Sequence, residues 1–400
     1  MNLLMKSLTL DSLIFILPRA VSLLAIALLA SSLSDLGTYA IIISWAVILS
    51  ILIGFGLHEI PHLHGDKKNP LKQIFSIQTL LAIVVVFAAL VTSLSYYSII
   101  LALLSVIHKN FFFALRGANN ITILHKGEIG RCFFLLMIYL LAPITVHNLL
   151  LALIIAFSLS NVYYFTQISS SGSLERKDVI YGAKNIVSQI LWAARVPITI
   201  AFAATVLTLE EVGILQLCLY LLFFLDIICN SLTLRALPAF RNGAKTASFG
   251  LRSIFIFSGL CFVLFIIVSR FHYQYLPFLV LCAALFSISR VYRLFARYKD
   301  KWTFVLLYDL LAFLVFIGIS IYARTINDFI LASSLLMFVS ALLVFLTFVR
   351  SKYEARYIAL LLLSVPLFFI HWIVSVSILF ILVLSCGLTC KKYILSDYGY

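Results

Sequence analysis

The chain has 400 residues, of which 64% are hydrophobic and only 11% are charged. Soluble domains are about half apolar and about a quarter charged, so this composition excludes a soluble globular protein and indicates a polytopic membrane protein. The formal net charge of +14 also suggests nucleic-acid binding, an alternative that the positions of the basic residues can test. The cysteines are scattered and form no CxxC pair, so we interpret them as small apolar residues rather than metal ligands or disulfides.

Apolar runs of about 20 residues, the length at which a helix crosses the hydrocarbon core of a membrane, recur along the whole chain. They cover residues 12–33, 39–57, 74–94, 98–116, 129–146, 148–168, 187–208, 213–234, 251–269, 275–292, 303–322 and 329–349. A last run, Tyr357–Cys390, is too long for one crossing and is divided by Pro366 and by the polar pair His371–Trp372. The sequence therefore predicts an all-α polytopic membrane protein of about fourteen transmembrane helices.

The loops between these spans differ in charge from one side of the membrane to the other. Basic residues, Arg131 and Arg293 among them, gather on the side of the N-terminus, whereas the other side receives only Arg270 and Arg324. The positive-inside rule then places both termini in the cytoplasm. Topology and contact with anionic lipids explain the basic excess, so we expect membrane lipids and no nucleic acid as partners.

The connections between spans are short and carry no catalytic or phosphate-binding motif. The sequence contains no GxxxxGK[ST] loop and no nucleophile–base constellation outside the membrane. His58 and His62 have the spacing of metal ligands on a helix, but Pro61 interrupts the helix between them. We therefore expect a protein that is not an enzyme and that holds no cofactor and no metal.

The first and seventh spans repeat each other. Aligning the sequence with itself so that Arg19 falls on Arg195 also pairs Asp35 with Glu211 and Gly37 with Gly213, without a gap. An even number of crossings separates the two spans, so the repeat is parallel, with two bundles of about six helices each. We expect an N-terminal bundle, a C-terminal bundle and an extra transmembrane helix pair at residues 1–170, 186–349 and 356–390.

Several segments resemble one family of transporters. The first span carries a mid-membrane arginine, SDLGTYAIIIS follows it, the second span closes with IGFGLHEIPHL, and LRGANN follows the fourth span. This pattern resembles the Wzx-type flippases of O-antigen and capsule repeat units, within the multidrug/oligosaccharidyl-lipid/polysaccharide exporter superfamily. The resemblance implies a bacterial cytoplasmic (inner) membrane protein that moves a lipid-linked oligosaccharide. A polysaccharide polymerase and a chain-length regulator are further candidate partners.

Basic residues within the spans are the candidate substrate-binding groups, because a charge at membrane depth is costly and marks a functional site by default. Arg19 follows Pro18 directly, Arg195 precedes Pro197 by two residues, and Trp192 shares a helical face with Arg195. His108 and Lys109 lie in the fourth span. The resemblance implies a cationic cavity that binds the anionic part of the cargo. The alternatives are structural ion pairs, snorkelling arginines, and a shifted fourth span whose Lys109 reaches the cytoplasmic surface.

Acidic residues in or near the spans are the candidate ion-coupling groups. Asp226 lies in the middle of the eighth span, Asp309 lies near the start of the eleventh, and Glu59 ends the second. A carboxylate within the membrane can bind a coupling proton or sodium ion, or it can be the counter-ion of a nearby arginine. For Asp309 and Glu59, a hydrated position near the interface is a further alternative, and Glu59 could belong to a gate.

Two other functions remain open on the sequence alone. A cation-coupled exporter of drugs would share the architecture, although basic residues in the cavity would repel a cationic cargo at low dielectric. A membrane polysaccharide polymerase would need sizeable external loops that carry catalytic groups, and the external loops here are short. We therefore favour a flippase that works by alternating access.

Overall fold

The computed structural model describes most of the chain, and all that follows concerns that part. It describes residues 17–18, 20–61, 69–118, 120–170, 172–192, 195–220, 222, 225, 228–229, 246–268, 273–298, 301–349, 352–370, 377–386 and 389. Arg19 and Asp226 lie outside the described residues, and so does the side chain of Trp192. Their assigned roles stay predictions.

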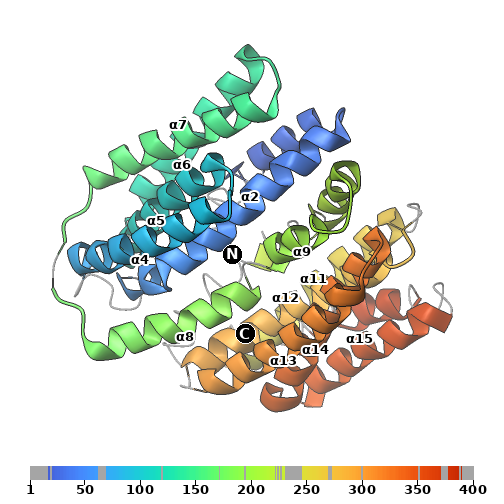
Figure 1. Ribbon diagram of the computed structural model, residues 1–400. Helices are drawn as coiled ribbons and strands as arrows, with labels where there is room; N and C mark the ends of the chain where they lie inside the picture. Colours follow the sequence, from blue (N-terminus) through green and yellow to red (C-terminus); the bar gives the residue numbers. More distant parts are fainter. Residues whose placement is uncertain are drawn as a thin grey trace. The chain divides into compact units, whose positions relative to one another are not determined.

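The described chain is helical throughout its length, which confirms the predicted all-α class (Figure 1). Its first half holds α2 (Leu33–Gly54), η1 (Leu57–Glu59), α4 (Leu71–Val91), α5 (Tyr96–Gly117), α6 (Ile121–Leu141), α7 (Val146–Phe165), α8 (Arg176–Trp192) and α9 (Arg195–Ala203). Its second half holds α11 (Thr246–Val268), α12 (Leu276–Tyr298), α13 (Trp302–Tyr322), α14 (Ile326–Phe348) and α15 (Lys352–Ile370).

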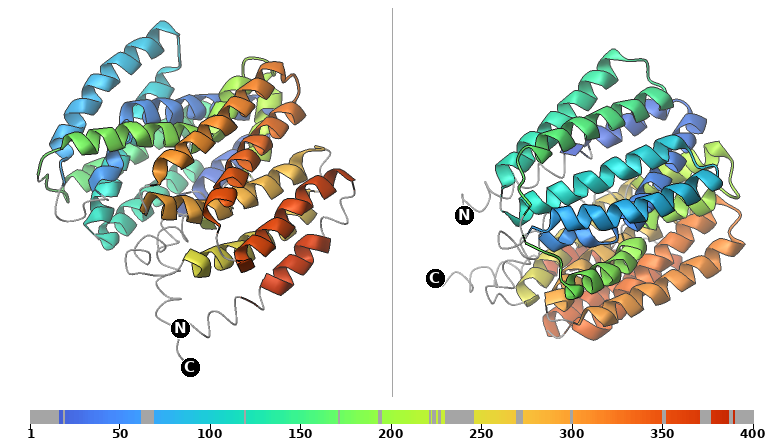
Figure 2. Two further views of the ribbon diagram at one scale, coloured as in Figure 1. Left: turned by 90° about the horizontal axis from the view of Figure 1, so that it is seen from below. Right: turned by 60° about the vertical axis from the view of Figure 1, so that its left-hand side comes forward.

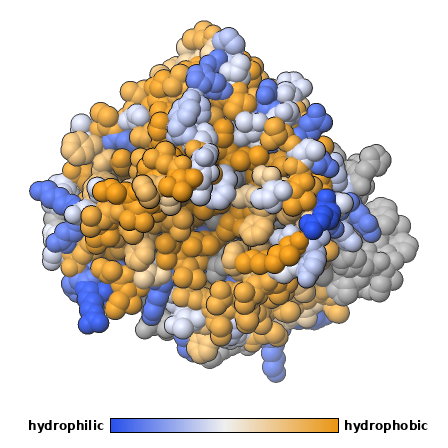
Figure 3. All heavy atoms as spheres, viewed as in Figure 1, coloured by the Kyte–Doolittle hydropathy of each residue, from blue (hydrophilic) through white to orange (hydrophobic). Residues whose placement is uncertain are grey.

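Among the described residues, 8 helices are long and apolar enough to cross a membrane. This finding agrees with a multi-pass membrane protein, while the larger number of spans and the orientation stay predictions. Apolar side chains also cover much of the face seen in Figure 3. On α4, Leu80, Val84 and Phe87 are exposed, as expected for a helix face that lipid covers rather than protein.

Some helix boundaries differ from the predicted spans. Helix α6 begins at Ile121, whereas the predicted span began at residue 129, because the charged residues before that point were interpreted as a loop. Helix α15 continues through Pro366 to Ile370, so this proline does not divide the last apolar run. A shorter helix, Ser377–Cys386, follows.

The helices form two compact units, Met1–Leu217 and Cys218–Tyr400, which we call the N-terminal and C-terminal units. In the N-terminal unit, α2 packs against α5 and α9, and α7 packs against α5 and α6. The two views of Figure 2 agree that α6 and α7 are neighbours. In the C-terminal unit, α12 is the central helix and packs against α11, α14 and α15. The predicted bundle boundaries are not tested by these units and stay predictions.

The residues paired by the repeat include two helix caps. The Ser32 side chain accepts a hydrogen bond from the Asp35 backbone N–H at 3.3 Å, at the start of α2. At the equivalent positions, the Thr208 side chain accepts from the Glu211 N–H at 3.4 Å, and Glu211 accepts from the Thr208 N–H at 2.9 Å. The acidic residues that match in sequence therefore serve helix capping, which satisfies donors that a helix start leaves open.

The two glycines paired by the repeat lie at one close crossing in the N-terminal unit. A Cβ atom added to Gly37 would collide with the backbone of Leu209, and one added to Gly213 would collide with the backbone of Leu33. The alignment that maps Gly37 onto Gly213 also maps Leu33 onto Leu209. The contact is therefore reciprocal, as about a local two-fold axis, and only glycine allows the two backbones this close.

Candidate functional site

Lys109 places a positive charge on a membrane-spanning helix. It belongs to α5, its side chain is half-buried, and its Nζ donates a hydrogen bond to Ser50 Oγ of α2 at 3.0 Å. Among the described residues, no carboxylate lies within ion-pair distance of this ammonium group. Basic residues buried in a membrane protein normally have a counter-ion or face a water-filled cavity. Lys109 therefore offers a charge that an anionic ligand could neutralise.

A pair of buried amides lies beside Lys109 and holds the end of α2. Asn110 Nδ2 donates to Gln78 Oε1 at 2.5 Å, and Gln78 Nε2 donates to the backbone carbonyl of Gly54 at 3.0 Å. The last carbonyls of a helix have no partner within the helix, and leaving one unsatisfied in an apolar interior is costly. The amide pair therefore fixes the place where α2 ends, next to the helix that carries Lys109.

The backbone then turns sharply and is held by α8. Phe55 and Gly56 have φ angles of 47° and 66°, a left-handed conformation that costs energy for a residue other than glycine. Gly56 accepts a hydrogen bond from Asn185 Nδ2 at 3.3 Å, and Glu59 accepts one from Tyr181 Oη at 3.1 Å. Glu59 is thus a half-buried contact between η1 and α8, while its predicted role in ion coupling remains untested.

Further into the N-terminal unit, a carboxylate on α6 forms the centre of a buried cluster. Glu128 is 3% exposed. Its Oε2 lies 2.5 Å from Arg131 Nη2, and its Oε1 lies 3.0 Å from His108 Nε2. Tyr164 Oη of α7 donates to the same Oε1 at 3.0 Å. The group of His108, Glu128, Arg131 and Tyr164, which we call the α6 cluster, therefore joins three helices through one acid.

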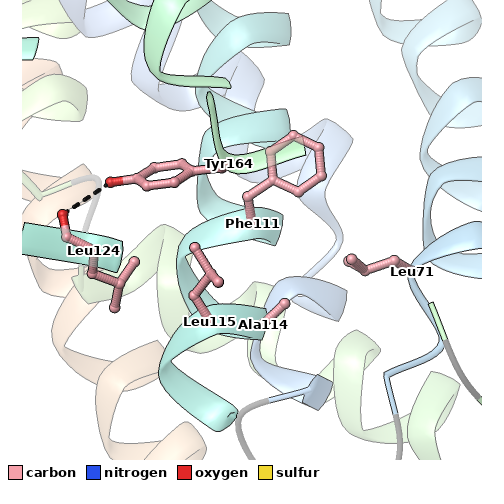
Figure 4. Close-up of a cluster of buried hydrophobic side chains, with 6 residues drawn as sticks. All are labelled: Leu71, Phe111, Ala114, Leu115, Leu124 and Tyr164. Atoms are coloured by element: carbon pink, nitrogen blue, oxygen red, sulfur yellow. Dashed lines mark hydrogen bonds between the residues drawn. The ribbon is translucent and has the colours of Figure 1, made fainter. Parts of the chain in front are cut away.

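Packing holds the members of the α6 cluster in place. Tyr164 is fully buried, lies among Phe111, Leu115 and Leu124, and also donates to the Leu124 carbonyl at 3.3 Å (Figure 4). The Arg131 guanidinium lies 4.7 Å from the centre of the Phe157 ring, a distance at which the ring face attracts a cation. His108 therefore contacts an ion pair rather than an open surface, although its predicted role in substrate binding is not tested.

A second carboxylate, Asp309 on α13, lies in a comparable cluster in the C-terminal unit. Asp309 is 3% exposed and its partner Arg293 of α12 only 1%. Arg293 Nη1 lies 2.6 Å from both carboxylate oxygens, Ser340 Oγ donates to Oδ1 at 2.5 Å, and Arg293 Nε donates to Ser289 Oγ at 3.2 Å. We call this group the α13 cluster. Asp309 is therefore paired with an arginine and is not hydrated at an interface, while its predicted role in ion coupling remains untested.

The remaining predicted residue, Arg195, is the first residue of α9. It is 8% exposed, and its backbone carbonyl accepts a hydrogen bond from Thr199 Oγ1 at 2.8 Å. The helix that begins there packs against α2, the helix that also supplies Ser50 to Lys109. The described part of the chain holds no group of His, Cys, Asp and Glu side chains that could bind a metal ion.

Sequence reasoning missed three charged residues of these clusters. Arg131 and Arg293 were counted among the basic residues on the side of the N-terminus, and Glu128 fell just outside the predicted span 129–146, whereas all three are buried or largely buried. One signal was available, because the spacing of Glu128 and Arg131 (i, i+3) lets them pair on one helix face. The partner of Asp309 comes from another helix, and no local spacing reveals it.

Comparisons with known proteins place the fold. No protein-family model and no curated protein matches the sequence. One similar solved structure is an outward-facing multidrug resistance MATE family transporter of the MOP superfamily, with 14% identity, a TM-score of 0.57, and coverage of 89% of this chain and 96% of that chain.

A second similar structure is a MOP superfamily transporter from Pyrococcus furiosus, for which a reverse polarity of the binding pocket suggests a different function. Its identity is 13% and its TM-score 0.56, with coverage of 89% of this chain and 96% of that chain. At these identities the likeness concerns architecture, since one fold can serve several functions. The chain therefore has the fold of the MOP superfamily transporters.

Proposed function

We propose that this protein is a flippase that moves a lipid-linked oligosaccharide, joined through an anionic pyrophosphate, across the bacterial cytoplasmic membrane by alternating access. The observation that carries the proposal is Lys109. Its ammonium group lies on a membrane-spanning helix and contacts a neutral hydroxyl, with no described carboxylate in ion-pair range. Because electrostatic attraction is strong at low dielectric, an anionic cargo gains most from such a charge.

The neighbourhood of Lys109 suits an anionic ligand that also carries sugars. Ser50 beside the ammonium group offers a hydroxyl, and Arg195 begins a helix that packs against α2. A guanidinium group can bind phosphate oxygens in pairs, and an ammonium group binds them as a point charge.

A cation-coupled exporter of drugs is the second candidate, because one similar fold belongs to a multidrug resistance transporter. The charge of Lys109 disfavours a cationic drug as cargo. The transporter with reversed pocket polarity is a precedent for this fold with a different charge in the pocket. A drug-susceptibility panel separates the two candidates, since an exporter raises resistance to several unrelated drugs and a dedicated flippase does not.

The proposal is tested by reconstitution with a fluorescent undecaprenyl-pyrophosphate glycan. We expect the wild-type protein to move the probe to the opposite leaflet, where a membrane-impermeant quencher reaches it. Lys109→Ala should lower the rate by about tenfold or more, the change that a loss of roughly 1.4 kcal/mol of charge attraction would cause. Lys109→Arg should keep most of the activity because it keeps the charge.

The matched control is Lys126→Ala, which removes a basic residue that is exposed on the neighbouring helix. It should flip the probe at the wild-type rate. No transfer by the wild-type protein above empty vesicles would refute the flippase. Equal loss in Lys109→Ala and Lys126→Ala would show that Lys109 has no special role.

A further inference from the structure

His108 lies between two groups of opposite charge, and one of its nitrogens faces both. His108 Nε2 is 3.0 Å from Glu128 Oε1 and 3.1 Å from Arg131 Nη1. An imidazole nitrogen either donates a hydrogen bond through its N–H or accepts one through its lone pair. The same nitrogen therefore cannot satisfy the carboxylate and the guanidinium group at once.

The protonation state of the ring decides which partner is satisfied. In the neutral ring, Nδ1–H donates to Ser160 Oγ, 3.4 Å away, and the Nε2 lone pair accepts from Arg131. When a proton from solution binds Nε2, that nitrogen donates to Glu128 instead, and the cluster changes from no net charge to one positive charge. Both states use the contacts present, so His108 can exchange one partner for the other.

We propose that His108 is the binding site of a coupling proton, which exchanges Arg131 for Glu128 as the partner of Nε2. This inference rests on the proposed transport function and deepens it by naming the ion. Histidine is the one side chain whose ordinary pKa lies within the range of cellular pH. The proton site lies in the N-terminal unit, at a residue that the sequence suggested for cargo.

The surroundings of the ring contain few other groups that could take the proton. Glu128 and Arg131 of α6 and Tyr164 of α7 contact the ring, and Lys109 follows His108 on α5 itself. Cys132 lies beside Glu128 and Arg131. Arginine, tyrosine and lysine ordinarily titrate far above neutral pH. Glu128 already accepts hydrogen bonds from Arg131 and Tyr164. Among the described residues, α2 and α4 place no charged group in contact with the ring.

Proton binding would change the packing of α6 against α5. Once Nε2 carries a proton, Arg131 Nη1 loses its acceptor and lies beside a second cation. The Arg131 side chain is only 11% exposed, so little water can replace the lost contact. A buried charged donor without a partner is costly, so the guanidinium group or the helix that carries it has to move. His108 and Lys109 are adjacent on α5, and a shift there would reach the proposed cargo-binding residue directly.

The proton site is tested without any cargo. The full-length protein, labelled with 15N-histidine and reconstituted in liposomes, is examined by solid-state NMR between about pH 5 and about pH 8, where histidine ordinarily titrates. The signal that His108→Gln removes is that of His108. We expect its Nε2 to change from an acceptor nitrogen at high pH to a protonated nitrogen at low pH, and the Arg131 side-chain signal to shift with it.

Two variants keep this measurement interpretable. Glu128→Gln removes the charge that the protonated ring faces, so His108 should stay neutral over the whole range. His147→Gln changes an exposed histidine of α7 and should leave the His108 signal as in wild type. A His108 signal that keeps one protonation state throughout would overturn the proton site, even if the wild-type protein flips lipid.

A second measurement connects the proton to transport. With the fluorescent undecaprenyl-pyrophosphate glycan as probe, the wild-type flipping rate should depend on pH, by up to about tenfold per pH unit where proton occupancy limits it. In His108→Gln this dependence should be lost. Flipping by His108→Gln with the wild-type pH profile would overturn the coupling role. Titration of His108 without any flipping would instead refute the proposed function and leave the proton site standing.

Discussion

The α6 cluster and the α13 cluster are two versions of one arrangement. When the sequence is aligned with itself so that Glu128 falls on Asp309, Ser160 falls one position after Ser340. The shift between the two copies is close to the one that maps Arg19 onto Arg195. These residues lie on helices that follow each other in the same order in both units. In each cluster an arginine pairs with the buried acid, and its guanidinium group faces a phenylalanine ring. The position of the acid is common to both, while its partners differ.

The two clusters differ in the helix that supplies the arginine. We call the α13 cluster closed, because its arginine occupies both oxygens of the acid, and the α6 cluster adjustable, because its arginine occupies only one. In the C-terminal unit, Arg293 comes from the neighbouring helix α12, and its Nη1 reaches both oxygens of Asp309. In the N-terminal unit, Arg131 comes from the same helix as Glu128 and hydrogen-bonds one oxygen, leaving the other to His108 and Tyr164. A buried acid at this position can thus either join two helices through a fixed ion pair, as Asp309 does, or belong to a site whose hydrogen-bond partners can change, as Glu128 does.

The largest expected effect comes from breaking the closed pair. Arg293→Ala should lower the free energy of unfolding by about 3–5 kcal/mol, because it leaves Asp309 buried without its counter-ion. Thermal unfolding of the purified protein in detergent measures the loss. Arg324→Ala, at an exposed arginine outside the cluster, is the control and should change little.

The double variant Arg293→Leu with Asp309→Leu sharpens the result. Replacing both members of a buried ion pair by apolar residues is often close to neutral, so it should recover much of the stability that Arg293→Ala loses. A double variant as unstable as the single one would contradict a simple pair and point to the serine contacts instead.

The adjustable cluster should tolerate the same kind of change better. Arg131→Ala should lower the free energy of unfolding by about 2 kcal/mol, less than Arg293→Ala, because Glu128 keeps the hydrogen bond from Tyr164 and His108 Nε2, 3.0 Å from its Oε1, is then free to donate to it. The two variants are compared in the same thermal unfolding measurement. An equal or larger loss for Arg131→Ala would remove the distinction between the closed and the adjustable cluster.

The sequence predicts the features that depend on neighbouring residues, and it misses the contacts between residues of different helices. Run length and hydropathy predict the helical class, and the alignment of the chain with itself finds Gly37, Gly213 and the two capping acids. Hydropathy counts every charged residue as unfavourable within a span, so the predicted spans ended short of Glu128 and Arg293. A buried charge is tolerated when another helix supplies its partner, and such partners become visible only in three dimensions.

The smallest effect tests whether one hydroxyl distinguishes the two clusters. When Glu128 is aligned with Asp309, Tyr164 falls on Phe345, whose ring packs edge-on against Tyr292 instead of donating to the acid. Tyr164→Phe therefore makes the α6 cluster more like the α13 cluster at that position. It should cost about 1.5 kcal/mol, the lower end of the range for one hydrogen bond to a charged group, without changing the packing in Figure 4.

The same variant also affects the proposed proton site. Glu128 Oε1 accepts from Tyr164 and lies 3.0 Å from His108 Nε2, so removing the hydroxyl leaves the protonated ring as the main donor to that oxygen. The protonated ring should then be favoured, and the NMR transition of His108 should move to higher pH than in wild type. A transition that moves to lower pH, or stays in place while the stability falls as expected, would show that Tyr164 and His108 do not share the acid.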